Sequence, residues 1–188
     1  MKIGVYGGSF NPVHKGHIKI ANYVIDNNLV DKLLIVPSYN YWDKNNLISI
    51  DDRVNMLKFY EKDNIIVDSE FSHLIYTYQI IESLKEKYKN DDFCLIIGAD
   101  NIVNFDKWKN YKKLLELELI IFARNGIDII PYLKKMGKID NYVIVEELGE
   151  IDISSTMIRN NIENTNFIKN YLDEEVLDYI VKKRLYWK

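Results

Sequence analysis

The sequence of 188 residues contains little cysteine, proline or glycine: one cysteine, three prolines and eight glycines. The single cysteine, Cys94, lies inside the apolar run 93–97, so we interpret it as a buried strand residue and exclude a disulfide within the chain. No stretch has the proline, glycine or serine content of a linker, and we find no repeat or low-complexity tract. We therefore expect one domain over residues 1–188.

The sequence also lacks a strong excess of charge of either sign. Its 25 lysines and arginines face 28 acidic residues, which gives a formal net charge of -3. Such a chain has no global basic field that would attract nucleic acid or an anionic membrane. No apolar run is long enough to span a bilayer, and no signal peptide precedes the first apolar run. We expect a cytoplasmic protein with small-molecule partners, either a monomer or a homodimer.

Short apolar runs that alternate with helical patterns occupy most of the chain. The runs predict strands at residues 2–6, 32–36, 64–67, 93–97, 119–123 and 142–145. The patterns between and after them predict helices at residues 16–26, 50–60, 77–88, 111–117, 127–136, 155–161 and 173–184. This alternation predicts an α/β fold: a Rossmann-like, doubly wound and mainly parallel sheet with helices on both faces and a C-terminal helical segment.

The segment 7–17, GGSFNPVHKGH, joins the first predicted strand to the first helix. Its glycines allow close approach of a ligand, and the helix start directs free N–H groups at the same place. His14 and His17 are three residues apart, so they can share one helix face. The combination suits a nucleotide phosphate, although a plain helix start with two solvated histidines is the alternative. Zinc is disfavoured because His73 is the only other histidine and no cysteine or carboxylate cluster accompanies the pair, so we predict no metal site built from protein ligands.

Two further motifs carry polar groups at predicted helix starts or strand ends. Residues 153–159, ISSTMIR, place three hydroxyls at a helix start and Arg159 about one turn later. Alone this is an ordinary capped helix with a surface arginine, but together with segment 7–17 it could hold a polyphosphate from two sides. Gly98-Ala99-Asp100 follows the fourth strand, where Asp100 could accept hydrogen bonds from a ribose. Trp108 could stack on a planar ring, with core packing as its alternative role.

In this order, the motifs resemble those of the nicotinate-nucleotide adenylyltransferase family, within the HxGH nucleotidyltransferase superfamily. Segment 7–17 is similar to the family's GGSFDPVHxGH, with Asn11 where aspartate is frequent, and segment 153–159 is similar to its ISSTxIR. Four further parts of the chain also resemble family motifs: Tyr76-Thr77, Gly98-Ala99-Asp100 with Trp108, residues 124–126 and the closing helix. One departure is the loop 38–48, rich in asparagine and aromatic residues, where the family usually has PPHK and only Lys44 could replace the lysine.

The resemblance implies transfer of the adenylyl group of ATP to nicotinate mononucleotide, giving deamido-NAD and pyrophosphate. It implies ATP as co-substrate and Mg²⁺ held mainly by substrate phosphates. The implied catalytic residues are His14, His17 and Arg159. The implied ATP-binding residues are these three together with Gly7, Gly8, Ser9, Phe10, Gly98, Asp100, Ile153, Ser154, Ser155 and Thr156. The implied residues for the acceptor nucleotide are Lys44, Thr77, Trp108 and Arg124.

Three alternatives remain at this point. The acceptor could be nicotinamide mononucleotide, since one group near Trp108 could decide between a carboxylate and an amide. It could be another phosphorylated compound, although the pantetheine-phosphate enzymes typically have threonine where His14 stands, and the cytidylyl enzymes have a different closing motif. Finally, the chain could be a nucleotide-binding sensor without catalysis. The intact set of His14, His17 and Arg159 argues against a sensor.

Overall fold

The computed structural model describes residues 1–39, 47–124, 126–146, 148 and 153–187. Within these residues, six parallel strands form one sheet in the order β3-β2-β1-β4-β5-β6. The strands are β1 (Lys2–Gly8), β2 (Lys32–Pro37), β3 (Ile65–Val67), β4 (Asp92–Gly98), β5 (Glu118–Phe122) and β6 (Tyr142–Val145). The strand order reverses between β1 and β4, which is the position where parallel sheets of this kind open a crevice for ligands.

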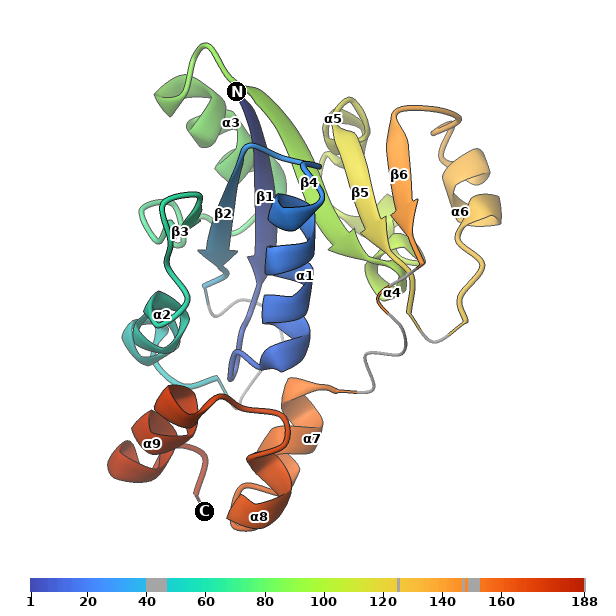
Figure 1. Ribbon diagram of the computed structural model, residues 1–188. Coiled ribbons are helices and arrows are strands. Elements are labelled where there is room, and N and C mark those ends of the chain that lie inside the picture. The colour runs from blue at the N-terminus through green and yellow to red at the C-terminus, as the bar shows by residue number, and fades with distance from the viewer. Residues whose placement is uncertain (40–46, 125, 147, 149–152, 188) are drawn as a thin grey trace.

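Helices cover both faces of the sheet, which confirms the predicted fold class. One face packs against α1 (Lys15–Asp26), α2 (Ile50–Lys58), α7 (Ser155–Asn160), α8 (Thr165–Ile168) and α9 (Glu174–Lys183). The other packs against α3 (Thr77–Lys87), α4 (Ala99–Ile102), the 3-10 turn η1 (Phe105–Lys107), α5 (Tyr111–Leu115) and α6 (Ile130–Lys135). In Figure 1 the strand arrows point toward the end of the sheet where α7, α8 and α9 gather.

The core consists of two apolar layers, one on each side of the sheet. Within β1, Ile3 and Val5 pack into one layer and Tyr6 into the other, as the period of two along a strand requires. Cys94 is fully buried in β4, and burial raises the pKa of its thiol to about 12. The interpretation of Cys94 as a packing residue is therefore confirmed. No helix in the described part of the chain is long and apolar enough to cross a bilayer.

The observed elements differ from the predicted ones mainly at short helices. The helix predicted at 127–136 begins only at Ile130. The N–H group of Ile130 donates a hydrogen bond of 3.1 Å to the carboxylate of Asp128, which lies before the helix. The helices α4 and α8 were not predicted, because four residues are too few to show a helical period. The cap of α2 is Ser49, whose hydroxyl accepts a hydrogen bond of 3.0 Å from the N–H group of Asp52.

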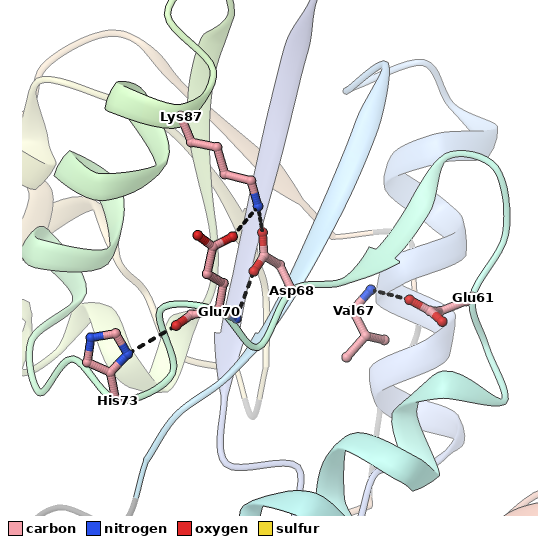
Figure 2. A network of polar contacts seen from close by, with 6 residues as sticks. All are labelled: Glu61, Val67, Asp68, Glu70, His73 and Lys87. Atoms are coloured by element: carbon pink, nitrogen blue, oxygen red, sulfur yellow. Dashed lines mark hydrogen bonds and ion pairs between the residues drawn. The ribbon is translucent and has the colours of Figure 1, made fainter.

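A network of polar contacts fixes the connection between β3 and α3 (Figure 2). The ammonium group of Lys87 lies 3.1 Å from the buried carboxylate of Asp68 and 2.6 Å from that of Glu70. The Asp68 carboxylate also accepts the N–H group of Glu70 at 3.0 Å, and a ring nitrogen of His73 contacts the Glu70 carbonyl. These contacts hold the residues that lead into α3, which begins at Thr77.

Candidate active site

A cavity of about 460 Å³ opens at the carboxyl ends of β1 and β4, where the strand order reverses. Its lining comes from the ends of these strands, the start of α1, the start of α3 and the region after β5. The predicted site residues that line it are Gly7, Gly8, Ser9, Phe10, His14, His17, Thr77, Gly98, Asp100, Trp108, Arg124 and Ser155.

The imidazoles of His14 and His17 stack on each other at the start of α1. Their ring centroids are 3.7 Å apart, with the planes inclined by 26°. His14 is the N-cap residue of α1, and its N–H group donates to Nδ1 of His17 at 3.2 Å. The ring of His17 also packs edge-on against Phe10, with centroids 4.9 Å apart. The shared helix face predicted from the spacing of the two histidines is thus confirmed, and both rings are held in place.

The surroundings of the two imidazoles keep them uncharged near neutral pH. Burial and, to a smaller degree, the positive charge of Arg124 lower the pKa of His14 to about 3. Burial, His14 and Arg124 also hold the pKa of His17 well below its usual value. Because Nδ1 of His17 accepts a hydrogen bond, the proton of the neutral ring belongs on Nε2. The structure therefore favours a role for these histidines as neutral N–H donors rather than as imidazolium cations.

The turn between β1 and α1 has a tightly packed backbone. Phe10 adopts the left-handed region, with φ of 45°, and its side chain is buried. A Cβ atom on Gly8 would lie 3.0 Å from the Phe10 ring, so a larger residue at this position would require the ring to move. A Cβ atom on Gly7 would meet nothing within 4 Å, and this side of the turn is open to the cavity. A ligand can therefore approach the backbone at Gly7.

The start of α7 packs directly against this turn, although the two segments are far apart in sequence. The hydroxyl of Ser155 donates to the Pro12 carbonyl at 2.9 Å, and Nη1 of Arg159 donates to the Asn11 carbonyl at 2.7 Å. Nη2 of Arg159 also donates to the hydroxyl of Thr156 at 3.1 Å. The structure thus brings together the two segments for which a joint grip on a polyphosphate was predicted.

Most of the described residues in 153–159 lie beside the cavity rather than on its wall. Ser155 lines the cavity, but Ile153, Ser154, Thr156 and Arg159 are not part of the lining. Ser154 caps α7 by accepting a hydrogen bond from the N–H group of Met157 at 3.1 Å. Arg159 is turned toward the backbone of the β1–α1 turn, so it orients that turn as well as carrying charge.

The other predicted residues come from the regions after β4 and β5 and from the segment after β2. Arg124 donates to the Ile153 carbonyl at 2.9 Å, and its charge acts on both histidines, which places it near the imidazole pair. Trp108 lines the cavity while packing on Phe105, with ring centroids 5.0 Å apart, so both roles considered for it are compatible. Asp100 is exposed in the first turn of α4. Lys44 lies outside the described residues.

Sequence reasoning assigned no role to the side chain of Asn11, which is buried under the turn. Its Oδ1 accepts hydrogen bonds from the N–H group of Ile48 at 3.3 Å and from the hydroxyl of Tyr186 at 3.0 Å. These bonds attach the start of α2 and the end of the chain to the β1–α1 turn. The available signal was the position of Asn11 inside the motif, since an amide there can accept from two donors at once.

Comparisons with known proteins show the family of this chain. The model of the cytidylyltransferase-like family matches residues 5–161. A protein of Fusobacterium nucleatum named "Probable nicotinate-nucleotide adenylyltransferase" is 37% identical, over 97% of this chain and 98% of its own. One of the same name from Clostridium acetobutylicum is 33% identical, over 98% of both chains. This chain belongs to the nicotinate-nucleotide adenylyltransferase family.

A solved structure of this family superposes on the whole chain. The nicotinic acid mononucleotide adenylyltransferase of Plasmodium falciparum, in complex with NaAD, gives a TM-score of 0.83 at 27% identity. The match covers 98% of this chain and 97% of the other. The family resemblance and the fold expected from the motifs are both confirmed.

Proposed function

We propose that this protein transfers the adenylyl group of ATP to nicotinate mononucleotide and releases pyrophosphate and deamido-NAD. The observation that carries the proposal is the hydrogen bond by which Ser155, at the start of α7, contacts the β1–α1 turn. Ser155 and the imidazole pair line the same cavity. The same cavity extends to Thr77 and Trp108, which leaves a place for a second nucleotide. Membership of the nicotinate-nucleotide adenylyltransferase family supports this reaction and ATP as its co-substrate.

In the proposed reaction, a phosphate oxygen of the acceptor attacks the α-phosphorus of ATP. A new P–O bond forms as the bond to the bridging oxygen breaks, and the electron pair leaves on pyrophosphate. The attacking oxygen is already anionic, so no general base is needed. This fits a site whose two histidines are neutral and lack the basicity to take a proton. The protein aligns the two anions and stabilises the charge that develops on the leaving group.

We assign the phosphate end of the cavity to three kinds of donor. The backbone N–H groups of the turn from Gly8 to Phe10 approach the phosphates, and Nε2–H of His17 donates to the oxygens around the reacting phosphorus. His14 supports His17 by stacking and through its N–H bond to Nδ1. The start of α7 and the cationic group of Arg159 offset the charge of the β- and γ-phosphates, and Arg124 remains a proposed contact to the acceptor nucleotide.

We assign the opposite end of the cavity to the acceptor and the ATP ribose. Trp108 stacks on the nicotinate ring, and the start of α3 at Thr77 offers backbone N–H groups to its carboxylate. Gly98 and Asp100, at the end of β4, hold the ribose of ATP, because a carboxylate accepts hydrogen bonds from two adjacent hydroxyls. Lys44, which follows β2 in the sequence, remains the proposed contact to the acceptor phosphate.

We propose that Mg²⁺ enters with the triphosphate rather than being held by a protein cage. Among the described residues, no group of three or more histidine, cysteine, aspartate or glutamate side chains could hold a metal ion. Mg²⁺ commonly keeps several waters and takes its other ligands from substrate phosphates. The metal is therefore treated as part of the MgATP substrate.

Pyrophosphate release tests the proposal directly. The protein is incubated with ATP and Mg²⁺ together with nicotinate mononucleotide, nicotinamide mononucleotide or phosphopantetheine, each in a separate reaction. We expect release with nicotinate mononucleotide, and a lower kcat/KM with the nicotinamide compound. Preference for another acceptor would correct the substrate. Release with none of them, while ATP still binds, would favour a nucleotide-binding sensor.

A further inference from the structure

Arg53, in α2, is a cation with a fully buried side chain directly behind the candidate active site. Its relative exposure is 0%. Its Nη1 donates to the Ser9 carbonyl and to the Ser38 carbonyl, each at 2.8 Å. Ser9 belongs to the β1–α1 turn and Ser38 follows β2, and both line the cavity, whereas Arg53 does not. One nitrogen atom thus connects two separate segments of the cavity wall.

The bond from Arg53 to the Ser9 carbonyl determines where the N–H group of Phe10 points. In a trans peptide the C=O and N–H bonds are antiparallel, so an N–H group points away from the cation that holds the carbonyl of the same peptide. Arg53 holds the Ser9 carbonyl, so the N–H group of Phe10, a residue that lines the cavity, points away from Arg53. A cation on the carbonyl also polarises the peptide and strengthens its N–H group as a donor. The Ser9 carbonyl oxygen is thereby directed at Arg53 instead of at a bound anion.

Arg53 also joins the phosphate side of the site to the loop after β2. The N–H group of Ser38 donates to the Gly8 carbonyl at 2.8 Å, so the two segments are already paired there. The bonds of Arg53 extend this pairing to Ser9 on the first segment and hold the carbonyl of Ser38 itself on the second. Burial lowers the pKa of the Arg53 guanidinium, but arginine keeps its charge in proteins. The link is therefore permanent at physiological pH.

We propose that Arg53 is a positioning residue for adenylyl transfer: it orients the Ser9–Phe10 peptide toward the triphosphate and couples that turn to Ser38, in a separate segment of the cavity wall. The inference rests on the proposed function. It predicts that loss of Arg53 impairs the use of both substrates together. A role in stability alone would leave the kinetic constants of the folded enzyme unchanged.

Lys138 provides a matched control. Its side chain is also buried, with 6% exposure, and its ammonium group donates to two backbone carbonyls, those of Leu115 at 2.7 Å and Leu117 at 2.8 Å. These carbonyls precede β5, at the amino end of the sheet and opposite the cavity. Arg53→Met and Lys138→Met therefore remove similar buried contacts, but only the first lies at the site.

The test compares four proteins: the wild type, Arg53→Met, Arg53→Lys and Lys138→Met. For each, the midpoint of thermal unfolding is measured first. The steady-state release of pyrophosphate is then measured at a temperature below the lowest of these midpoints. We expect Arg53→Met to raise the KM of both ATP and nicotinate mononucleotide and to lower kcat/KM by about 10²-fold, the order expected for misplaced substrates. Lys138→Met should stay within about twofold of the wild type. Arg53→Lys should recover part of the activity, because the bonds to Ser9 and Ser38 come from a single nitrogen that an ammonium group can replace.

Two results would overturn the inference. The first is that Arg53→Met has the same kcat and KM values as Lys138→Met, even if its thermal midpoint is lower than that of the wild type. The other is a rise in the KM of one substrate only. Should Arg53→Met fail to fold, Arg53→Gln takes its place, and we expect the same rise in both KM values. If the wild-type protein releases no pyrophosphate, that result contradicts the proposed function and not the role of Arg53. The affinity for a non-hydrolysable ATP analogue would then test Arg53. We expect weaker binding in Arg53→Met and unchanged binding in Lys138→Met.

Discussion

The hydroxyl of Ser155 donates a hydrogen bond of 2.9 Å to the carbonyl of Pro12, across 143 positions of sequence. This bond joins the start of α7 to the turn that carries the imidazole pair. Arg159 adds a second bond between the same segments, at 2.7 Å to the Asn11 carbonyl. Two helix starts, each with a positive dipole end, therefore meet beside one cavity, and such an arrangement favours a polyphosphate.

His17→Ala should lower kcat by about 10²-fold or more, because it removes an N–H donor that stabilises charge in the transition state. The measurement is pyrophosphate release at saturating ATP and nicotinate mononucleotide. His73→Ala is the control, since His73 is exposed and does not line the cavity. An unchanged kcat in His17→Ala would remove this histidine from the catalytic group.

Trp108→Ala should raise the KM of nicotinate mononucleotide by about tenfold, since stacking of a base on an aromatic ring contributes roughly 1–3 kcal/mol. The KM of ATP should change less than twofold. Trp108→Phe should keep most of the affinity and the packing on Phe105. If both KM values rise equally in Trp108→Ala, the tryptophan serves packing and not the acceptor.

Gly98→Ala should weaken ATP binding with little loss of stability. An alanine Cβ would lie 2.5 Å from Oδ1 of Asp100, so the carboxylate would have to rotate away from its present position. The backbone of Gly98, with φ of -80°, suits alanine, and the fold should tolerate the change. We expect the KM of ATP to rise about tenfold, as for a lost hydrogen bond to a charged group. Asp100→Asn should show a similar rise; normal ATP affinity in both variants would exclude Asp100 from the ribose site.

The stability of the protein should fall as the pH falls below about 6.5, in part because of His14. Its pKa is about 3 in the folded protein and near 6.5 when unfolded, so between these values the unfolded chain binds the additional proton. The free energy of unfolding, measured with urea, should lose roughly 2 kcal/mol from His14 between pH 7.5 and pH 5. The shift of His17 has the same sign.

Two variants separate the contribution of His14 from that of other groups. His14→Gln should show a smaller loss of stability between the two pH values than the wild type, whatever its stability at pH 7.5. His73→Gln should show the same loss as the wild type, because His73 is exposed. Equal pH dependence in His14→Gln and the wild type would contradict the assignment of a neutral, buried His14.

The strands and the larger helices were predictable because each carries a local signal. A strand buried on both faces is an uninterrupted apolar run, and β6 (Tyr142–Val145) has the predicted bounds. Helix α1 differs by one residue from its predicted start, since the glycine-rich turn ends where the amphipathic period begins. By contrast, α8 (Thr165–Ile168) is a single turn stabilised by its Asn164 cap and by the burial of Ile168, and no periodicity is visible at that length.

The site was predictable in its parts but not in its electrostatics. The motifs identified the cavity residues because glycines and histidines at a strand-to-helix turn already imply an anion site. The neutral state of His17 depends on burial and on Arg124, which comes from a distant part of the sequence. Arg53 was missed because an arginine in a polar helix is usually exposed. Its spacing of three and four residues from the buried Met56 and Leu57 was the available signal.

A crystal structure with a non-hydrolysable ATP analogue and Mg²⁺ tests the central claim most directly. The account predicts the triphosphate in the 460 Å³ cavity, with His17 Nε2 on one side and the Ser155–Arg159 turn on the other. A triphosphate in the separate cavity of about 400 Å³ beside Gly126 and Asp128, or one that contacts only one of the two segments, would contradict it.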